Sequence, residues 1–414
     1  MKAVGVVVEY NPFHHGHAYH VESAKKATGA NVVIAAMSGN FLQRGEPAMV
    51  SKWTRTEMAL KGGIDIVFEL PYSFAVQKAD TFAVGAVSLL AEAGCDSICF
   101  GSESGNINTF YQTYHFLSRN QEAYNHNIKH FIDKGYSYPK ASSMAFQAIA
   151  PANDLIDLSL PNNILGFQYV KAAEARKYPV KMVTIARKNA NYHDEHFTSA
   201  SIASATSIRK ALFSNDSTLA GIQSYVPIDT FEGLQRYQED YGDFHDWNMY
   251  WSYLRFNLLQ LSSTELKEIY EVEEGIENRL FSLALKCETF PQFMKALKTK
   301  RYTWTRLQRM LTHILTHSTK SEMTADSHIT YLRLLGMTET GRNYLNQLKK
   351  TCQIPIISKR SSFTNQQIQT DTKAARIYAM GLPEKYRQKA IELEFNQKPI
   401  YLQNHSSEQK NKAI

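Results

Sequence analysis

A short apolar run that ends in two histidines constrains the fold of this chain more than any other feature. Residues 4–8 are valine or glycine, and His14 and His17 follow shortly after in the spacing His-x-Gly-His. Apolar residues then recur every third position, at 18, 21, 24 and 27, which predicts a helix. Where a strand turns into a helix, free backbone N–H groups can bind phosphate. The pattern predicts a strand–turn–helix unit for a polyphosphate, with Gly16 allowing close backbone approach.

Two other interpretations of the histidine pair were weighed on the residues alone. His14 and His17 are suitably spaced for a metal, but no third ligand of certain identity accompanies them. Buried histidines also occur in purely structural turns. We therefore expect phosphate chemistry, in which both imidazoles act on a ligand, and we expect no metal site.

The first half of the chain alternates between apolar strands and helices. Expected strands are 3–8, 31–37, 64–68, 97–100 and 180–185, and expected helices are 17–28, 51–62, 79–93 and 162–177. This alternation predicts an α/β fold with a Rossmann-like open parallel sheet and its ligand beyond the carboxyl ends of the strands. Residues 106–157 break the pattern and are expected to form a helical insertion that covers the site.

From about residue 215 the pattern becomes mainly helical. Expected helices are 247–260, 265–282, 290–298 and 305–316, with a short strand at 353–357. We therefore expect a catalytic domain over 1–214 and a mainly helical domain over 215–403. Residues 404–414 are polar and are expected to be a disordered tail.

The composition is that of a soluble globular protein. Hydrophobic residues make up 43% of the 414 residues and charged residues 21%, and no apolar stretch is long enough to span a membrane. The chain enters a strand almost at once, so no signal peptide is expected, and its four scattered cysteines suggest reduced thiols in the cytoplasm. The net charge of +7 permits a nucleic-acid partner without requiring one.

A second motif, Ile-Ala-Ser-Ala-Thr-Ser-Ile-Arg at 202–209, precedes another expected helix. The hydroxyls of Ser204 and Thr206 and the N–H groups of the helix start can bind phosphate oxygens, and Arg209 adds a positive charge. Taken alone, the segment is also an ordinary helix-capping sequence.

The strand, the His-x-Gly-His turn and the helix resemble the signature of the nucleotidylyltransferase superfamily. Residues 202–209 are similar to its Ser-Ser-Thr-x-Ile-Arg signature, with Ala205 in place of the second serine and thus one hydroxyl fewer for phosphate. The longer string Glu-Tyr-Asn-Pro-Phe-His-His-Gly-His-Ala-Tyr-His at 9–20 resembles the bacterial tRNA(Met) cytidine acetate ligase family. Segments 100–103, 161–166 and 331–336 also look family-like, so the resemblance covers essentially the whole chain.

The resemblance implies an enzyme that makes N4-acetylcytidine at the wobble position of elongator tRNA(Met), through acetyl-adenylate formed from acetate and ATP. His14 and His17 would be catalytic, and Mg²⁺ is expected with the phosphates. The expected ATP-binding residues are Val7, Val8, Glu9, Tyr10, Asn11, Pro12, Phe13, His14, His15, Gly16, His17, His20, Gly101, Asn162, Arg187, Lys188, Ser204, Thr206 and Arg209. Arg187 and Lys188 close the fifth expected strand, although a solvated pair of cations is the alternative there.

A polar loop at 38–47 follows the second expected strand and should face the same edge of the sheet. Gln43, Arg44 and Lys52 carry the donors needed where acetate and the cytosine ring meet. The alternative is an ordinary loop followed by a helix that Ser51 caps.

Basic and aromatic residues interleave at 298–309. Cations bind RNA phosphates and aromatic rings stack on unpaired bases, as an anticodon loop offers them. The expected tRNA-binding residues are Lys300, Arg301, Tyr302, Trp304, Arg306 and Arg309. A solvated helix face is the alternative.

Two other functions remain open from the sequence. A nucleotidylyltransferase acting on a small phosphorylated metabolite explains both motifs but not the basic and aromatic second half. A non-catalytic RNA-binding protein with a degenerate nucleotide fold explains the second half but not the intact histidine motif.

Overall fold

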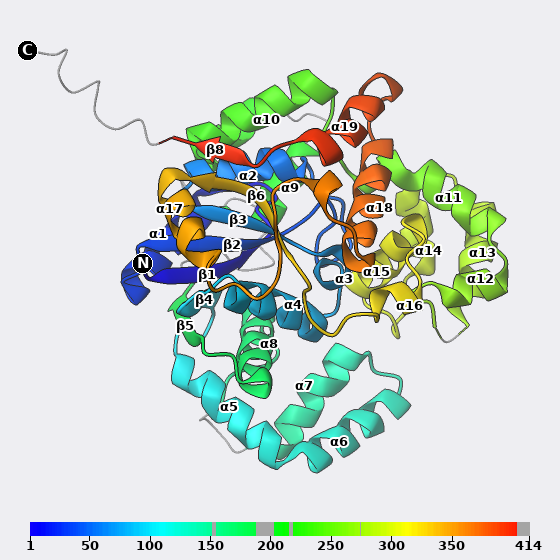
Figure 1. The fold of residues 1–414 in the computed structure, drawn as a ribbon. Helices are drawn as coiled ribbons and strands as arrows, with labels where there is room; N and C mark the ends of the chain where they lie inside the picture. Colours follow the sequence, from blue (N-terminus) through cyan, green and yellow to red (C-terminus); the bar gives the residue numbers. More distant parts are fainter. Residues whose placement is uncertain (151–154, 188–202, 215–217, 274, 404–414) are drawn as a thin grey trace, which may run out of the picture.

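The computed structural model describes residues 1–150, 155–187, 203–214, 218–273 and 275–403. At its centre lies one sheet with the strand order β5-β4-β1-β2-β3-β6-β7, and β8 pairs with β6 (Figure 1). The strands from β5 to β3 are parallel: β1 (Ala3–Val8), β2 (Val32–Ser38), β3 (Ile66–Leu70), β4 (Ser97–Ser102) and β5 (Lys181–Ala186). The predicted α/β fold with an open, mostly parallel sheet is confirmed.

Both faces of this sheet are buried by helices. In β2, Val32, Ile34 and Ala36 belong to one apolar cluster, and Val33, Ala35 and Met37 belong to another. The first face packs against α4 (Ala79–Glu92), α8 (Pro161–Arg176) and α17 (Glu339–Leu348), and the second against α1 (His15–Thr28) and α2 (Lys52–Lys61). α10 (Ile228–Tyr241) packs on the outside of α2. Burial on both faces requires continuous apolar strands. Burying each large aliphatic side chain contributes about 1.5–3 kcal/mol to the stability of the fold.

The order of the strands determines where a ligand can bind. β2 and β3 lie on one side of β1, whereas β4 and β5 lie on the other. At such a reversal the carboxyl ends of the strands border a crevice. The turn after β1, with His14 and His17, therefore meets Gly101 of β4 at one edge of the sheet.

The expected insertion is helical and consists of α5 (Ile107–Arg119), α6 (Gln121–Asp133) and α7 (Tyr138–Ile149). α6 and α7 pack against each other and project away from the sheet, beyond α8 (Figure 1). The structure describes all of residues 106–150, and none of them lines the cavity identified below. The described residues of the expected insertion therefore do not cover the site, and residues 151–154 of the predicted range lie outside the described residues.

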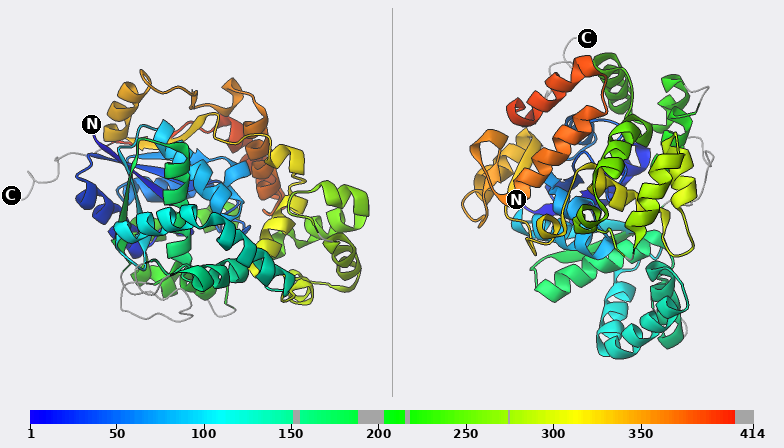
Figure 2. Two further views of the ribbon diagram at one scale, coloured as in Figure 1. Left: turned by 90° about the horizontal axis from the view of Figure 1, so that it is seen from below. Right: turned by 90° about the vertical axis from the view of Figure 1, so that its right-hand side faces the viewer.

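A third apolar cluster holds together the helices that follow residue 246 (green to yellow in Figure 2). These helices are α11 (Trp251–Gln260), α12 (Ser263–Glu268), α13 (Ile276–Lys286), α14 (Phe290–Leu297), α15 (Trp304–Leu315) and α16 (Lys320–Met323). The single helix expected over 265–282 is wrong, because Glu271 and Gly275 adopt positive φ angles of 63° and 79° between α12 and α13. Across the described ranges, the structure contains no helix long and apolar enough to cross a membrane.

The C-terminal part returns to the sheet, so the boundary predicted at residue 215 needs correction. β6 (Leu332–Thr338) pairs antiparallel with β3, and β7 (Ile356–Ile357) and β8 (Ile400–Leu402) pair with β6. Between them lie α18 (Gln366–Met380) and α19 (Glu384–Asn396). The edge of β3 takes β6 as its partner, and β6 takes β7 and β8, so residues 332–402 do not belong to a separate helical domain. The tail predicted at 404–414 lies outside the described residues.

Candidate active site

The turn after β1 stacks the two histidines of the His-x-Gly-His motif. His14 is the N-cap of α1, and its Nδ1 accepts a hydrogen bond from the Gly16 N–H at 3.0 Å. His17 Nδ1 accepts from the His14 backbone N–H at 3.3 Å, and the ring centroids are 3.7 Å apart. A Cβ at position 16 would lie 2.8 Å from His14 Cε1. The glycine therefore makes room for the His14 ring itself.

These hydrogen bonds determine which nitrogen of each ring carries a proton. A neutral imidazole has one donor and one acceptor nitrogen, and Nδ1 is the acceptor in both residues. Nε2 of His14 and Nε2 of His17 are therefore N–H donors. Both residues line the cavity, where such donors can bind phosphoryl oxygens.

Burial keeps these rings neutral at physiological pH. It lowers the pKa of His14 to about 3, and the nearby Arg187 charge adds to the effect. Burial also lowers the pKa of His17 well below its usual range, and that of His20 to about 4. The positive charge of the site therefore comes from arginines rather than from histidines.

A second helix start lies next to the histidines. Ser204 caps α9 (Ala205–Leu212), and its hydroxyl accepts from the Ser207 N–H at 3.1 Å. Arg209 donates to the backbone oxygen of Asn11 at 2.9 Å and pairs with Glu46 at 3.2 Å. Ser204, Thr206 and Arg209 line the cavity, so the 202–209 motif reaches the His-x-Gly-His turn. A helix N-terminus with an arginine is suited to binding an anion.

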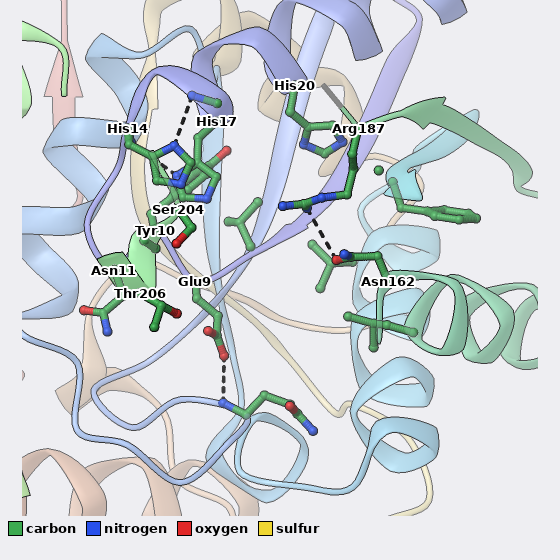
Figure 3. Close-up of a pocket in the computed structure, with 18 of the residues that line it drawn as sticks. Glu9, Tyr10, Asn11, His14, His17, His20, Asn162, Arg187, Ser204 and Thr206 are labelled. Carbon is green, nitrogen blue, oxygen red and sulfur yellow. Dashed lines mark hydrogen bonds between the residues drawn. The ribbon is translucent and has the colours of Figure 1, made fainter. Parts of the chain in front are cut away.

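The opposite wall comes from the ends of β4 and β5 and from the start of α8. Glu103 accepts from Asn162 Nδ2 at 2.7 Å and from the Asn163 N–H at 2.8 Å, which caps α8. Arg187 donates to Asn162 Oδ1 at 3.4 Å. Figure 3 shows Asn162 and Arg187 across the cavity from Asn11 and Thr206. This wall places a second guanidinium opposite the α9 terminus.

Together these elements border a cavity of about 340 Å³ at the carboxyl edge of the sheet, which is in the size range of small-molecule sites. Pro12, Phe13 and His15 were predicted to bind ATP but are absent from its described lining. Phe13 is fully buried, and its ring lies directly against Gly62. Lys188 lies outside the described residues. The predicted residues that do line the cavity are Val7, Val8, Glu9, Tyr10, Asn11, His14, Gly16, His17, His20, Gly101, Asn162, Arg187, Ser204, Thr206 and Arg209.

Sequence reasoning missed part of the lining. Leu165, Gly166 and Tyr169 of α8 line the cavity together with Asn162. Their positions repeat every three or four residues, so one face of an expected helix would have indicated them. Glu46 was also missed, although it belongs to the polar loop 38–47.

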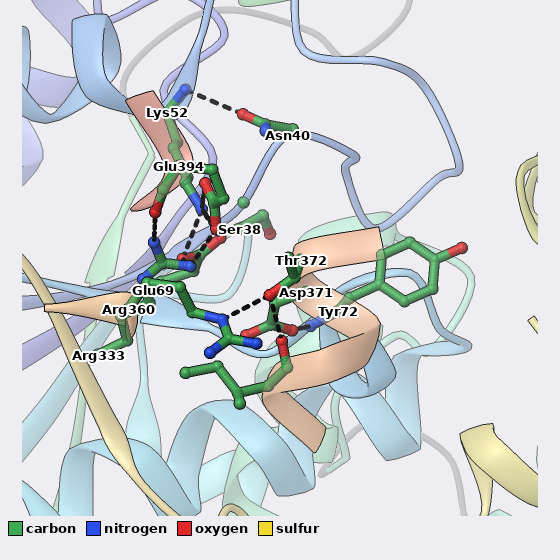
Figure 4. A network of polar contacts seen from close by, with 12 residues as sticks. Ser38, Asn40, Lys52, Glu69, Tyr72, Arg333, Arg360, Asp371, Thr372 and Glu394 are labelled. Carbon is green, nitrogen blue, oxygen red and sulfur yellow. Dashed lines mark hydrogen bonds and ion pairs between the residues drawn. The ribbon is translucent and has the colours of Figure 1, made fainter. Parts of the chain in front are cut away.

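Two of the three predicted acceptor-side residues reach the cavity. Gln43 and Arg44 line it. Lys52 does not: its side chain is 1% exposed, and its Nζ lies 2.8 Å from Glu69 and 2.9 Å from Glu394 (Figure 4). The prediction for Lys52 is corrected, because carboxylates from β3 and α19 converge on its charge in the interior.

The predicted tRNA-binding residues lie at the start of α15 and just before it. Lys300, Arg301 and Trp304 are exposed. Tyr302 is 8% exposed, and the buried Arg309 pairs with Glu271 at 2.9 Å. The prediction is corrected for these two residues, because the fold turns their side chains inward. Arg306 is half-buried and pairs with Glu273 at 3.3 Å.

Comparisons with known proteins agree with this architecture. The sequence model of the HIGH Nucleotidyl Transferase family matches residues 1–392. The chain is 47% identical over 401 residues to the tRNA(Met) cytidine acetate ligase of Geobacillus sp. (strain WCH70), covering 97% of this chain and 100% of that protein. It is 46% identical over 405 residues to the tRNA(Met) cytidine acetate ligase of Bacillus subtilis (strain 168), covering 97% of each.

Two crystal structures of Thermotoga maritima TmcAL are similar to this chain along nearly its full length. The apo form I has a TM-score of 0.90 and 32% identity, covering 97% of this chain and 100% of that chain. The form bound with alpha-thio ATP has a TM-score of 0.88 and 31% identity, with the same coverage. With both motifs at one cavity and similarity along nearly its full length, the chain belongs to the tRNA(Met) cytidine acetate ligase family of HIGH nucleotidyl transferases.

Proposed function

We propose that this protein is an ATP-dependent ligase that joins acetate to N4 of the wobble cytidine of elongator tRNA(Met). The observation that carries the proposal is the similarity along nearly the full length of proteins that bear this ligase name. A solved relative that holds an ATP analogue supports ATP as the nucleotide.

In the first step an acetate oxygen attacks the α-phosphorus of ATP, and pyrophosphate leaves. Negative charge then grows on the phosphoryl oxygens and on the leaving group. The Nε2–H groups of His14 and His17 and the N-terminus of α9 offset this charge with donors that are already oriented. Arg187 and Arg209 would bind the β- and γ-phosphates from opposite walls. Catalysis in this step is electrostatic, without a covalent enzyme intermediate.

Magnesium would enter with ATP as part of the substrate. Within the described ranges, no group of three or more histidine, cysteine or carboxylate side chains is arranged to hold a metal ion. We therefore assign no protein ligands to Mg²⁺, in keeping with its tendency to bind substrate phosphates and retain water.

In the second step the exocyclic amine of cytidine attacks the acetyl carbonyl of acetyl-adenylate, and AMP leaves. This step depends on positioning the amine beside the carbonyl. Gln43 and Arg44 line the cavity and would contact the acceptor there. The exposed Lys300, Arg301 and Trp304 and the half-buried Arg306 would contact the tRNA away from the reacting atoms.

The direct test is to incubate the protein with ATP, Mg²⁺, labelled acetate and unmodified elongator tRNA(Met), and then to analyse the digested tRNA by mass spectrometry. Labelled N4-acetylcytidine is expected, and a transcript with uridine at the wobble position should remain unlabelled. Acetyl-adenylate without any tRNA product would contradict the proposed acceptor. A lack of both products would overturn the ligase assignment.

A further inference from the structure

The acetyl-transfer step releases a proton from the cytidine amine, and the cavity must offer a group that accepts it. The histidine pair is unsuitable, because Nδ1 of each ring is occupied by a backbone N–H and Nε2 already carries a proton. His20 is hydrogen-bonded to the Cys99 backbone, and its Nε2 is shielded from solvent. Burial also raises the pKa of the Tyr10 and Tyr169 phenols far above their usual range. None of these groups is a good proton acceptor.

Two carboxylates belong to the described lining, and they differ in their partners. Glu46 pairs with the Arg209 guanidinium at 3.2 Å. Glu9 has no ion pair with any residue that the structure describes, and its Oε1 accepts from the Gln43 backbone N–H at 2.8 Å. The side chain of Gln43 is itself anchored, because Nε2 donates to the Gln77 backbone oxygen at 2.6 Å. Glu9 is therefore the carboxylate that the fold holds in place through a backbone hydrogen bond and without a direct ion pair among the described residues, although the Arg55 guanidinium donates to its backbone oxygen at 2.7 Å.

The position of Glu9 also fits the second step. It follows the last residue of β1, before the histidine turn, and is half-buried in the cavity wall. In Figure 3 its carboxylate points away from the imidazoles of His14 and His17, towards the part of the loop after β2 that carries its hydrogen bond. For Glu9 to act in the second step, the acyl group must extend from a phosphate at the histidines towards this carboxylate.

We infer that Glu9 is a catalytic residue of the transfer step, the general base that takes the proton from the N4 amine of cytidine. The inference rests on the proposed function. The N4 lone pair forms a bond to the acetyl carbon while the carbonyl electrons move to oxygen. A proton passes from N4 to the free Oε2 of Glu9. The intermediate collapses, the bond between the acyl carbon and the phosphate oxygen breaks, and AMP leaves with the electron pair. Glu9 then returns the proton to solvent.

The test separates the two half-reactions in the full-length protein with Glu9→Gln. Glutamine keeps the size of the side chain and an oxygen that accepts from the Gln43 N–H, but it cannot take up the proton. Acetate-dependent exchange between ATP and pyrophosphate measures the first step and also shows that the variant folds. Synthetic acetyl-adenylate and tRNA(Met), mixed under single-turnover conditions, measure the second. Glu22→Gln, on the exposed face of α1, is the matched control.

Acetyl transfer by Glu9→Gln should fall at least about 100-fold, the usual contribution of a general base, and by much more than exchange. The apparent Kd for tRNA should not change. Transfer within threefold of the wild type would overturn the inference. Equal losses in both steps would also overturn it and would place Glu9 in nucleotide binding. If the wild type itself forms no N4-acetylcytidine, the proposed function fails together with the inference.

Discussion

Two polar regions near the carboxyl ends of the central strands differ in whether the chain supplies all of their partners. The first is a buried ion cluster formed by Lys52, Glu69, Arg333 and Glu394, in which every charge lies within 3.2 Å of an opposite charge. The second is the cavity, which both histidines line and where only the Nδ1 atom of each ring has a hydrogen-bond partner among the described residues. Lys52 and the histidines look equally functional in the sequence. The difference teaches that a charged side chain buried among partners from its own chain is not available to a ligand.

The largest expected effect tests the buried ion cluster. Glu394→Ala leaves two buried cations with a single carboxylate, and breaking such a group by removing one partner costs about 3–5 kcal/mol. Urea unfolding should show this loss in the free energy of unfolding. Glu392→Ala, on the exposed side of the same helix, should change it by less than about 0.5 kcal/mol. Equal stability of the two variants would mean that the cluster has no structural role.

A somewhat smaller effect is expected in the cavity, and on activity rather than stability. His17→Ala removes one oriented donor and should lower acetate-dependent exchange between ATP and pyrophosphate by about 10²–10³-fold. Loss of its cap hydrogen bond should cost only about 0.5–2 kcal/mol of stability. His126→Ala, exposed on α6, should leave exchange unchanged. An unaltered exchange rate in His17→Ala would refute the electrostatic role of the pair.

The two regions should also respond to pH with opposite signs. Asp371 lies beside the buried ion cluster (Figure 4), where burial and the Glu69 charge raise its pKa to about 7. Its stabilising contribution is therefore complete below the unfolded pKa of about 3.9 and is lost as pH rises towards 7. His14 has a pKa of about 3, so its contribution is complete above the unfolded pKa of about 6.5 and is lost as pH falls.

Urea unfolding at pH 5 and pH 7 measures this contrast. Between these values the stability advantage of the wild type over Asp371→Asn should shrink by up to about 2 kcal/mol, because one pKa unit corresponds to 1.4 kcal/mol. The stability advantage of the wild type over His14→Ala should grow by a similar amount as pH rises from 5 to 7. Changes of the same sign in both variants would contradict the contrast.

The smallest expected effect lies outside both regions. Trp304 is 44% exposed at the start of α15, beside the exposed Lys300 and Arg301. If its ring stacks on an unpaired base, Trp304→Ala should weaken tRNA(Met) binding by about 1 kcal/mol, or roughly fivefold. Filter binding at constant salt measures this. Phe256→Ala, which removes a 63% exposed ring from α11, is the control and should bind like the wild type.

Local patterns predicted the core of the fold well. The first strand, the histidine turn and the first helix were all expected, because a buried parallel strand and the start of a helix each leave a signature within a few residues. The pairing of β6 with β3 has no such signature. It joins residues far apart in the sequence. The short strand β7 falls within the strand expected at 353–357, whereas β8 is indicated only by the partner it pairs with.

The same limit applies to the site. His14 and Arg209 were identified because each belongs to a motif at the start of an expected helix, and Arg187 because it closes an expected strand at the ligand-binding edge. Arg309 of α15 and Tyr302, just before that helix, were mistaken for surface residues, because composition does not reveal which side chains of this segment face the core. Lys52 was mistaken for a ligand-binding residue because its carboxylate partners come from β3 and α19, the latter near the end of the described chain.

By itself, the sequence determined the parallel core of the sheet, the edge at which a ligand binds, and the histidines and arginines gathered there. These follow from hydrophobic periodicity and from motifs in which neighbouring residues interact. Only the tertiary structure decided which polar residues are neutralised inside the protein and which remain open to the cavity. The physical reason is that the state of a charge depends on burial and on partners brought within about 3 Å, which are set by packing rather than by position in the chain.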